Sequence, residues 1–158
     1  MDINKLLSAD TILVDLTVKK KELLLNQMID KLQSFFSEEE LKQVREAVFD
    51  REKIMSTGVG KGLAIPHAKT NVTNESHAVF ARMQEPIEFN AVDSMPVSMV
   101  FLLVGPLNSN KLHIRLLSRI SRLMNSSGFR DTIMECGSAE EILEAFTKEE
   151  QKFFPAST

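Results

Sequence analysis

The sequence predicts an α/β fold in which a mixed sheet of about five strands is sandwiched between helices in a single domain. Apolar residues recur with a period of two in some segments and with a helical period in others, and these segments alternate along the chain. The 158 residues suffice for one sizeable core, and 43% hydrophobic with 26% charged residues is ordinary globular usage. Neither a repeat nor a linker interrupts the pattern, so we expect one domain over residues 1–150 and a C-terminal tail over 151–158.

The first third of the chain predicts a scaffold of one strand and two helices. Residues 11–16 alternate apolar and polar side chains, as a half-buried strand does. Over residues 19–36 the apolar side chains recur at helical spacing, with Thr17 as the expected N-cap. Ser37 and Glu40 have the spacing of a capping box, which predicts that a second helix begins there.

A run of alternating glycines marks the next segment. Residues 58–66 predict a tight glycine loop that leads into a short strand and stops at Pro66. The stretch 97–104 is apolar on both faces, as a central strand covered by helices is. The remaining elements are predicted from their apolar patterns: a strand over 77–83 and helices over 109–125 and 138–149.

Charge and cysteine content exclude several classes of protein. The 19 Lys and Arg residues against 22 Asp and Glu give a net charge of −3, which offers no overall attraction for nucleic acid. The longest strongly apolar stretch has eight residues, whereas a membrane-spanning helix needs about 20. Cys136 is the single cysteine and cannot form an internal disulfide. We therefore expect a cytoplasmic protein with neither membrane insertion nor a nucleic-acid partner.

The glycine loop does not match a nucleotide-binding motif. A dinucleotide fingerprint that begins at Gly58 requires glycine where Leu63 stands, and a phosphate-binding loop that ends at Gly60-Lys61 requires Ser or Thr where Gly62 stands. Two interpretations remain open. The loop is either a turn between packed elements or a concavity of backbone N–H groups that binds an anion.

Two histidines are candidate site residues. His67 directly follows Pro66 at an expected strand end, where it is either a capped surface residue or a functional group. His113 falls within the apolar arc of the helix over 109–125 and therefore turns inward, as a core histidine or as a ligand group beside the sheet. His77 has no such setting, so we interpret it as structural. No histidine spacing predicts a metal site.

Cations add two further candidates. Arg51 lies near the end of the second predicted helix, and its guanidinium can hold a phosphoryl group through two parallel hydrogen bonds, although most such arginines are solvated. A basic ridge occupies the polar side of the helix over 109–125, and it is either a solvated face or a docking stripe for an acidic protein patch. The ridge consists of Lys111, Arg115, Arg119 and Arg122.

The segment 51–68 resembles the active-site signature of the fructose/mannitol/nitrogen-regulatory class of enzyme IIA in the bacterial phosphotransferase system. The match runs from the acidic Glu52 through Val59-Gly60 to the run Leu63-Ala64-Ile65-Pro66-His67. The segment 85–93 and the order of helices and strands also resemble this family. One departure is Lys61, where some members carry an acid.

The resemblance implies that His67 takes a phosphoryl group from the phosphohistidine of HPr or its nitrogen-branch relative, and that His113 and Arg51 complete the site. The transfer needs charge stabilisation and positioning more than covalent help, and the donor supplies the driving force, so we expect neither cofactor nor metal. Hydroxyls and approachable backbone donors of the loop are expected to bind the phosphoryl group. These loop residues are Ser56, Thr57, Gly58 and Gly60.

The resemblance also frames the output of the protein. The chain looks like a free-standing enzyme IIA of type 2 over residues 1–150, most like the nitrogen-regulatory kind, whose phosphorylation changes contacts with a regulatory target protein. One alternative is a sugar-specific fructose or mannitol IIA that passes the phosphoryl group to a separate IIB. A second alternative is a non-catalytic regulatory binding protein of the same fold.

Overall fold

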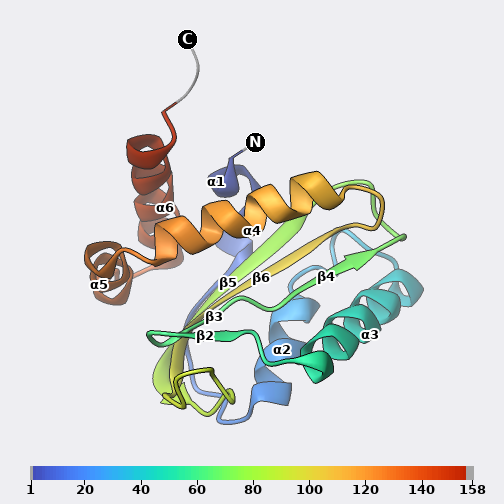
Figure 1. Cartoon of the computed structure of the whole chain (residues 1–158), viewed down its shortest axis with the longest axis horizontal. Coiled ribbons are helices and arrows are strands. Elements are labelled where there is room, and N and C mark those ends of the chain that lie inside the picture. Colours follow the sequence, from blue (N-terminus) through green and yellow to red (C-terminus); the bar gives the residue numbers. More distant parts are fainter. Residues whose placement is uncertain (1, 156–158) are drawn as a thin grey trace.

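The computed structural model describes residues 2–155, so the last three residues of the predicted tail lie outside it. Its centre is a mixed sheet of six strands rather than about five (Figure 1). The strand order is β1 (Ile12–Leu16), β5 (His77–Ile87), β6 (Val97–Pro106), β3 (Leu63–Ala64) and β2 (Gly58–Gly60), with β4 (His67–Thr70) also paired to β6. The β5–β6 and β2–β3 pairs are antiparallel, and the others are parallel.

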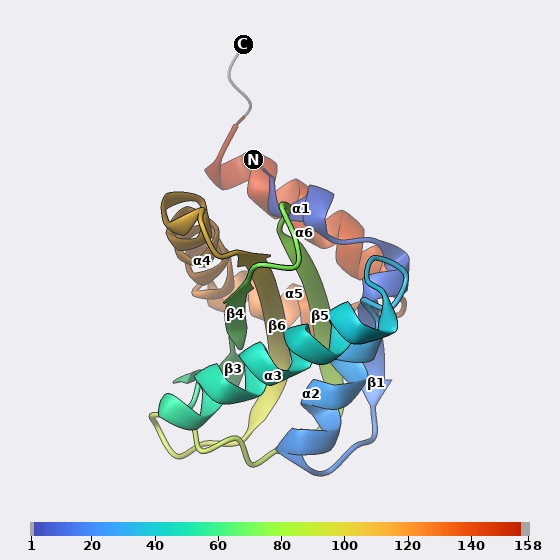
Figure 2. The ribbon, with the colours of Figure 1, turned by 90° about the vertical axis from the view of Figure 1, so that its right-hand side faces the viewer.

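Helices cover both faces of the sheet, as the sequence predicts (Figure 2). On one side lie α2 (Lys21–Asp30) and α3 (Glu38–Ile54). On the other side lie α1 (Ile3–Leu6), the short 3₁₀ turn Ala9–Thr11, α4 (Asn110–Met124), α5 (Ser127–Glu135) and α6 (Ala139–Phe153).

Strand β6 supplies both cores, because successive side chains of a strand point to opposite faces. Val100, Leu102 and Val104 pack under α2 and α3. Phe101 and Leu103 pack under α4 and α6. All five are fully buried, so the prediction of a central strand covered by helices is confirmed.

The capping-box prediction is confirmed at α3, where the Ser37 hydroxyl accepts from the Glu40 N–H and the Glu40 carboxylate accepts from the Ser37 N–H. The predicted helix over 19–36 is shorter than expected. It begins at Lys21 with Lys20 as its N-cap, so the Thr17 prediction is wrong, and it ends at Asp30. The following residues form tight i→i+3 turns, which keep nearly helical apolar spacing without continuing the helix.

Pro66 interrupts the strand pattern but does not end it. Its carbonyl accepts a hydrogen bond from the Leu103 N–H, so the backbone stays aligned with β6 and pairing resumes in β4. The sequence analysis also missed α5, which buries only Phe129 and Ile133 and so shows too few apolar repeats to stand out. Helix α6 continues to Phe153, four residues past its predicted end at 149, and therefore crosses the expected domain boundary.

A buried carboxylate connects the two ends of the described chain. Glu150, 3% exposed, accepts from the backbone N–H groups of Ile3 at 2.6 Å and Asn4 at 2.9 Å. Its Oε2 also lies 2.9 Å from Arg119 Nε. The carboxylate therefore satisfies the start of α1 and neutralises a cation on α4.

Replacing Glu150 by alanine is expected to destabilise the protein by about 3 kcal/mol, because it leaves the Arg119 charge and two backbone donors without their partner. Urea denaturation monitored by circular dichroism measures the change. The matched control is Glu144→Ala, which removes an exposed i,i+4 pair with Lys148 and is expected to cost about 0.5 kcal/mol or less. Equal losses in the two variants would contradict the role of the buried carboxylate.

Candidate active site

The fold brings His67 and His113 together, with ring centroids 5.7 Å apart. His67 is the first residue of β4 and is half-buried, whereas His113 projects from the first turn of α4 and is 5% exposed. Gly105 in β6 permits this arrangement, since a Cβ there would lie 2.9 Å from His113 Nδ1. The inward direction predicted for His113 is confirmed.

The hydrogen bonding of His67 selects its reactive nitrogen. Nδ1 lies 2.8 Å from the carbonyl oxygen of Ile65, and a carbonyl only accepts, so Nδ1 carries the proton. The lone pair of the neutral ring is then on Nε2. Burial lowers the pKa of His67, and the nearby Arg51 and Lys69 charges lower it further, against opposing effects of Ile65 and Glu52. At neutral pH the ring therefore offers a nucleophilic Nε2.

His113 is the neutral partner of the pair. Burial lowers its pKa to about 4, helped by the charges of His67 and Lys69. Among the described residues neither of its ring nitrogens has a hydrogen-bond partner. The ring can therefore direct a donor or an acceptor toward a group placed on His67.

Arg51 lies in the last turn of α3 and is partly buried. Its Nη1 donates to the carbonyl oxygen of Met55 at 3.0 Å, which holds the side chain at the helix end. Because its charge lowers the pKa of His67, Arg51 acts electrostatically on the candidate nucleophile. The remaining edge of the guanidinium is free to hold an anion.

The sequence analysis did not select Lys69 as a site residue. This lysine is exposed, it hydrogen-bonds the side chain of Asn110 at the start of α4, and its charge lowers the pKa of both site histidines. The signal was present in the sequence, since residues i and i+2 of a strand share a face and Lys69 follows His67 by two. Lys61 instead hydrogen-bonds Asn125 at the other end of α4.

The structure revises the role expected for Ser56 and Thr57. Thr57 donates its N–H and its hydroxyl to the Glu52 carboxylate, at 2.8 and 2.7 Å. Ser56 donates its hydroxyl to the carbonyl of Phe89 at 2.7 Å and accepts from the Gly58 N–H at 3.1 Å. These hydrogens are engaged within the loop, so in this conformation they are not available to a phosphoryl group.

The two glycines also serve the loop itself. A Cβ on Gly58 would lie 2.7 Å from the Ala91 Cα, so only glycine fits against the segment after β5. Gly60 has a φ of +99°, a conformation that other residues rarely adopt, at the turn between β2 and β3. Of the two interpretations of the glycine loop, the geometry favours a turn between packed elements.

Glu52 anchors this loop to the rest of the domain. Its carboxylate is 8% exposed and lies 2.8 Å from the ammonium of Lys21 on α2. Lys21 also donates to the carbonyl of Phe89, the group that accepts from Ser56. The acidic position at the start of the signature is therefore a buried ion pair that holds the segment between Arg51 and β2.

The depressed histidine pKa values predict how stability depends on pH. The pKa of His113 falls from 6.5 to about 4 on folding, and the pKa values of His67 and His77 also fall. Below about pH 6.5 the unfolded chain binds more protons, so the free energy of unfolding is expected to decrease as the pH drops toward 4. Urea denaturation at a series of pH values measures this slope.

The variant His113→Asn is expected to flatten this pH dependence, because it removes the histidine whose pKa changes most on folding. Some slope is expected to remain from His67 and His77. The matched control is His77→Asn, which removes a smaller shift. An unchanged slope in His113→Asn would show that His113 titrates normally in the folded protein.

Two further searches cover the described residues, 2–155. In this range no three His, Cys, Asp or Glu side chains are grouped so that they would hold a metal ion. No helix within the range combines the length and apolarity needed to cross a membrane.

The fold and the site define an α/β protein with a pair of neutral histidines beside two cations. The sequence profile of the family described as "Phosphoenolpyruvate-dependent sugar phosphotransferase system, EIIA 2" matches residues 5–149. The chain belongs to this family, and it is therefore a phosphotransfer component with a phosphocarrier function.

Curated relatives come from two branches. A nitrogen regulatory protein of Bradyrhizobium diazoefficiens is 33% identical over 142 residues, which cover 90% of this chain and 92% of that protein. The fructose-specific EIIABC component of the phosphotransferase system of Bacillus subtilis is 29% identical over 151 residues, which cover 96% of this chain and 24% of that protein. The chain thus spans about a quarter of the Bacillus protein and nearly all of the Bradyrhizobium one.

Solved structures have the same fold. The nitrogen regulatory protein IIA-Ntr of Neisseria meningitidis superimposes with a TM-score of 0.86 at 33% identity, over 91% of this chain and 98% of that chain. The IIA mannitol protein of Escherichia coli gives a TM-score of 0.73 at 20% identity, over 89% and 98% of the two chains. The predicted α/β fold and the resemblance to nitrogen-regulatory IIA proteins are confirmed.

Proposed function

We propose that this protein accepts a phosphoryl group from an HPr-type phosphocarrier on Nε2 of His67, and that the modification changes its contacts with a regulatory partner. The observation that carries the proposal is the hydrogen bond between His67 Nδ1 and the Ile65 carbonyl, which leaves Nε2 as the nucleophile. The lowered pKa of His67 supports it, because a protonated ring has no lone pair to offer.

In the proposed transfer the Nε2 lone pair attacks the phosphorus of the donor's phosphohistidine in line with the bond that breaks. The P–N bond of the donor cleaves, and its electron pair returns to the donor imidazole. Arg51, Lys69 and His113 are the groups proposed to stabilise the negative charge on the phosphoryl oxygens. Nδ1–H of His67 keeps its bond to Ile65 throughout, so the ring keeps its orientation.

The nitrogen-regulatory output is our first candidate. It is supported by the nitrogen regulatory relative and the IIA-Ntr structure, both of which this chain matches over nine tenths or more of their length. A phosphoryl group adds a charge of about −2 beside Arg51 and Lys69, which is sufficient to change a protein contact. Under this proposal the protein works in the cytoplasm, and its domain covers residues 1–150 with a tail over 151–158.

A sugar-specific role is the second candidate. It is supported by the fructose-specific relative, and by a complex of the mannitol enzyme IIA with phosphorylated enzyme IIB from Escherichia coli that has the same fold at 20% identity. In this role the phosphoryl group passes to a separate IIB. A non-catalytic regulator of the same fold would accept no phosphoryl group.

The test combines enzyme I, phosphoenolpyruvate and a panel of HPr-type donors with the purified protein. Intact mass is expected to show one phosphoryl adduct, and ¹⁵N chemical shifts of the imidazole are expected to place it on Nε2 of His67. Pulldowns with the two forms, beside transfer assays to purified IIB proteins, separate the branches. A partner that distinguishes the forms supports the regulatory output, and rapid transfer to one IIB supports the sugar-specific one. The absence of any adduct would contradict the phosphocarrier mechanism.

A further inference from the structure

We propose that the first three turns of α4 form a docking surface for an acidic face of the phosphoryl donor, which lies beside the donor's phosphohistidine. The inference rests on the proposed function and adds the chemistry of the partner. It starts from the basic ridge, for which the sequence left a solvated face and a docking stripe open. The structure divides the ridge into two halves with different environments.

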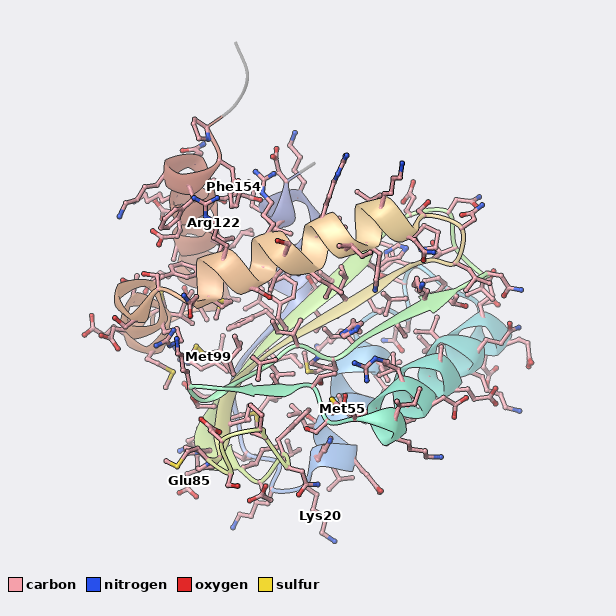
Figure 3. All side chains as sticks on the ribbon, viewed as in Figure 1. Lys20, Met55, Glu85, Met99, Arg122 and Phe154 are labelled. Carbon is pink, nitrogen blue, oxygen red and sulfur yellow. The ribbon has the colours of Figure 1, made fainter. Side chains whose placement is uncertain are left out.

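The C-terminal half of the ridge is occupied by the chain's own residues. Arg119 pairs with Glu150 and lies 4.0 Å from the centre of the Phe154 ring, and its side chain is 18% exposed. Arg122 lies 5.2 Å from the same ring, and Figure 3 shows the two side chains next to each other. Arg119 is therefore not part of a solvated face, and both cations are stacked on the end of the chain.

The N-terminal half of the ridge is free. Lys111 and Arg115 are exposed, and in the part of the chain that the structure describes neither forms an ion pair. Helix α4 contains four cations and no acidic residue over Asn110–Met124, in a chain whose net charge is −3. The free cations are thus concentrated on one helix, with nothing on that helix to neutralise them.

This half of the ridge borders the candidate site. His113 lies between Lys111 and Arg115 on the same helix, and the side chain of Lys69 is bound to Asn110 at the start of that helix. Ile114, 65% exposed, adds an apolar side chain to the surface. Met55, 70% exposed, lies at the end of α3 across from α4 (Figure 3). A donor that brings its phosphoryl group to His67 therefore has to contact the first turns of α4.

Charge complementarity then specifies the donor. Carboxylates facing Lys111 and Arg115 would steer association and stabilise the complex, whereas a basic face would be repelled. Because these cations are exposed, their effect is on association more than on the chemical step, and it is screened by salt. We name the surface formed by Lys111, Ile114 and Arg115 the α4 docking surface.

The test is single-turnover phosphoryl transfer to the double variant Lys111→Glu/Arg115→Glu from phosphorylated HPr-type donors with an acidic or a basic face. At low salt and subsaturating acidic donor, the second-order rate constant is expected to fall by about 10-fold or more, and the loss is expected to shrink at high salt. Transfer from the basic donor is expected to rise. The matched control is Lys31→Glu, an exposed single charge reversal after α2 on the opposite helical layer.

Saturation and binding measurements separate this inference from the proposed function. The maximal transfer rate at saturating donor is expected to stay unchanged, while chemical-shift titration with unphosphorylated acidic donor is expected to show weaker binding to the variant. Equal second-order rate constants in the double variant and in Lys31→Glu would overturn the docking surface and leave the acceptor role of His67 intact. Binding of the acidic donor through Lys111 and Arg115 without any transfer would overturn the acceptor role and leave the docking surface intact.

Discussion

Alanine in place of His67 is expected to abolish phosphoryl acceptance, because the variant lacks the Nε2 lone pair that the Ile65 carbonyl selects in the wild-type ring. The effect is expected to be complete rather than partial. His113 is buried and aimed into the same crevice, but we assign it charge stabilisation, and its pKa of about 4 makes it a weaker base than His67. The measurement is intact mass after incubation with enzyme I, phosphoenolpyruvate and an HPr-type donor.

The matched control is His77→Ala, since His77 packs against Phe35 and Phe36 outside the site. This variant is expected to take up the phosphoryl group like the wild type. Circular dichroism is expected to show that His67→Ala remains folded, because the half-buried ring makes one backbone hydrogen bond and belongs to neither core cluster. A full adduct on folded His67→Ala would show that another residue is the acceptor.

Much of the fold was predictable because its main signals are local or strongly periodic. The Ser37 cap depends on residues three apart, and β6 is apolar at nearly every position, so each identifies its element from sequence alone. The restart of the strand at His67 depends on β6, which lies more than thirty residues away, and the Pro66 carbonyl pairs there with Leu103. Pairing between distant segments leaves no local pattern to read.

The candidate site divides in the same way. The helical wheel turned His113 inward correctly, because a helix determines the direction of each side chain. The fate of the Thr57 hydroxyl was not predictable, since it depends on Glu52 folding back from the helix end and on Lys21 arriving from α2. The burial of Arg119 likewise depends on Glu150 in another helix. Residue types indicated the chemistry, and tertiary contacts decided which groups are free for it.

Lysine in place of Arg51 is expected to slow phosphoryl transfer about 100-fold although the charge is kept. In the structure Arg51 donates through Nη1 to the Met55 carbonyl, and this bond leaves the rest of its planar fork for an anion. A lysine has one ammonium nitrogen on a flexible stem, so it cannot hold the helix end and present two parallel donors to a phosphoryl group at once. Single-turnover transfer at saturating donor measures the effect.

The matched control is Arg45→Lys on the same helix, where the arginine bonds Asn26 and Asp30 away from the site. This exchange removes the same chemical group from α3, so any general effect on the helix appears in both variants. The pKa of His67, followed by NMR titration, is expected to stay lowered in Arg51→Lys, because a positive charge remains near the ring. A slow transfer with that pKa preserved identifies the geometry of the guanidinium as the cause, whereas a wild-type transfer rate would leave Arg51 only its bond to Met55 at the helix end.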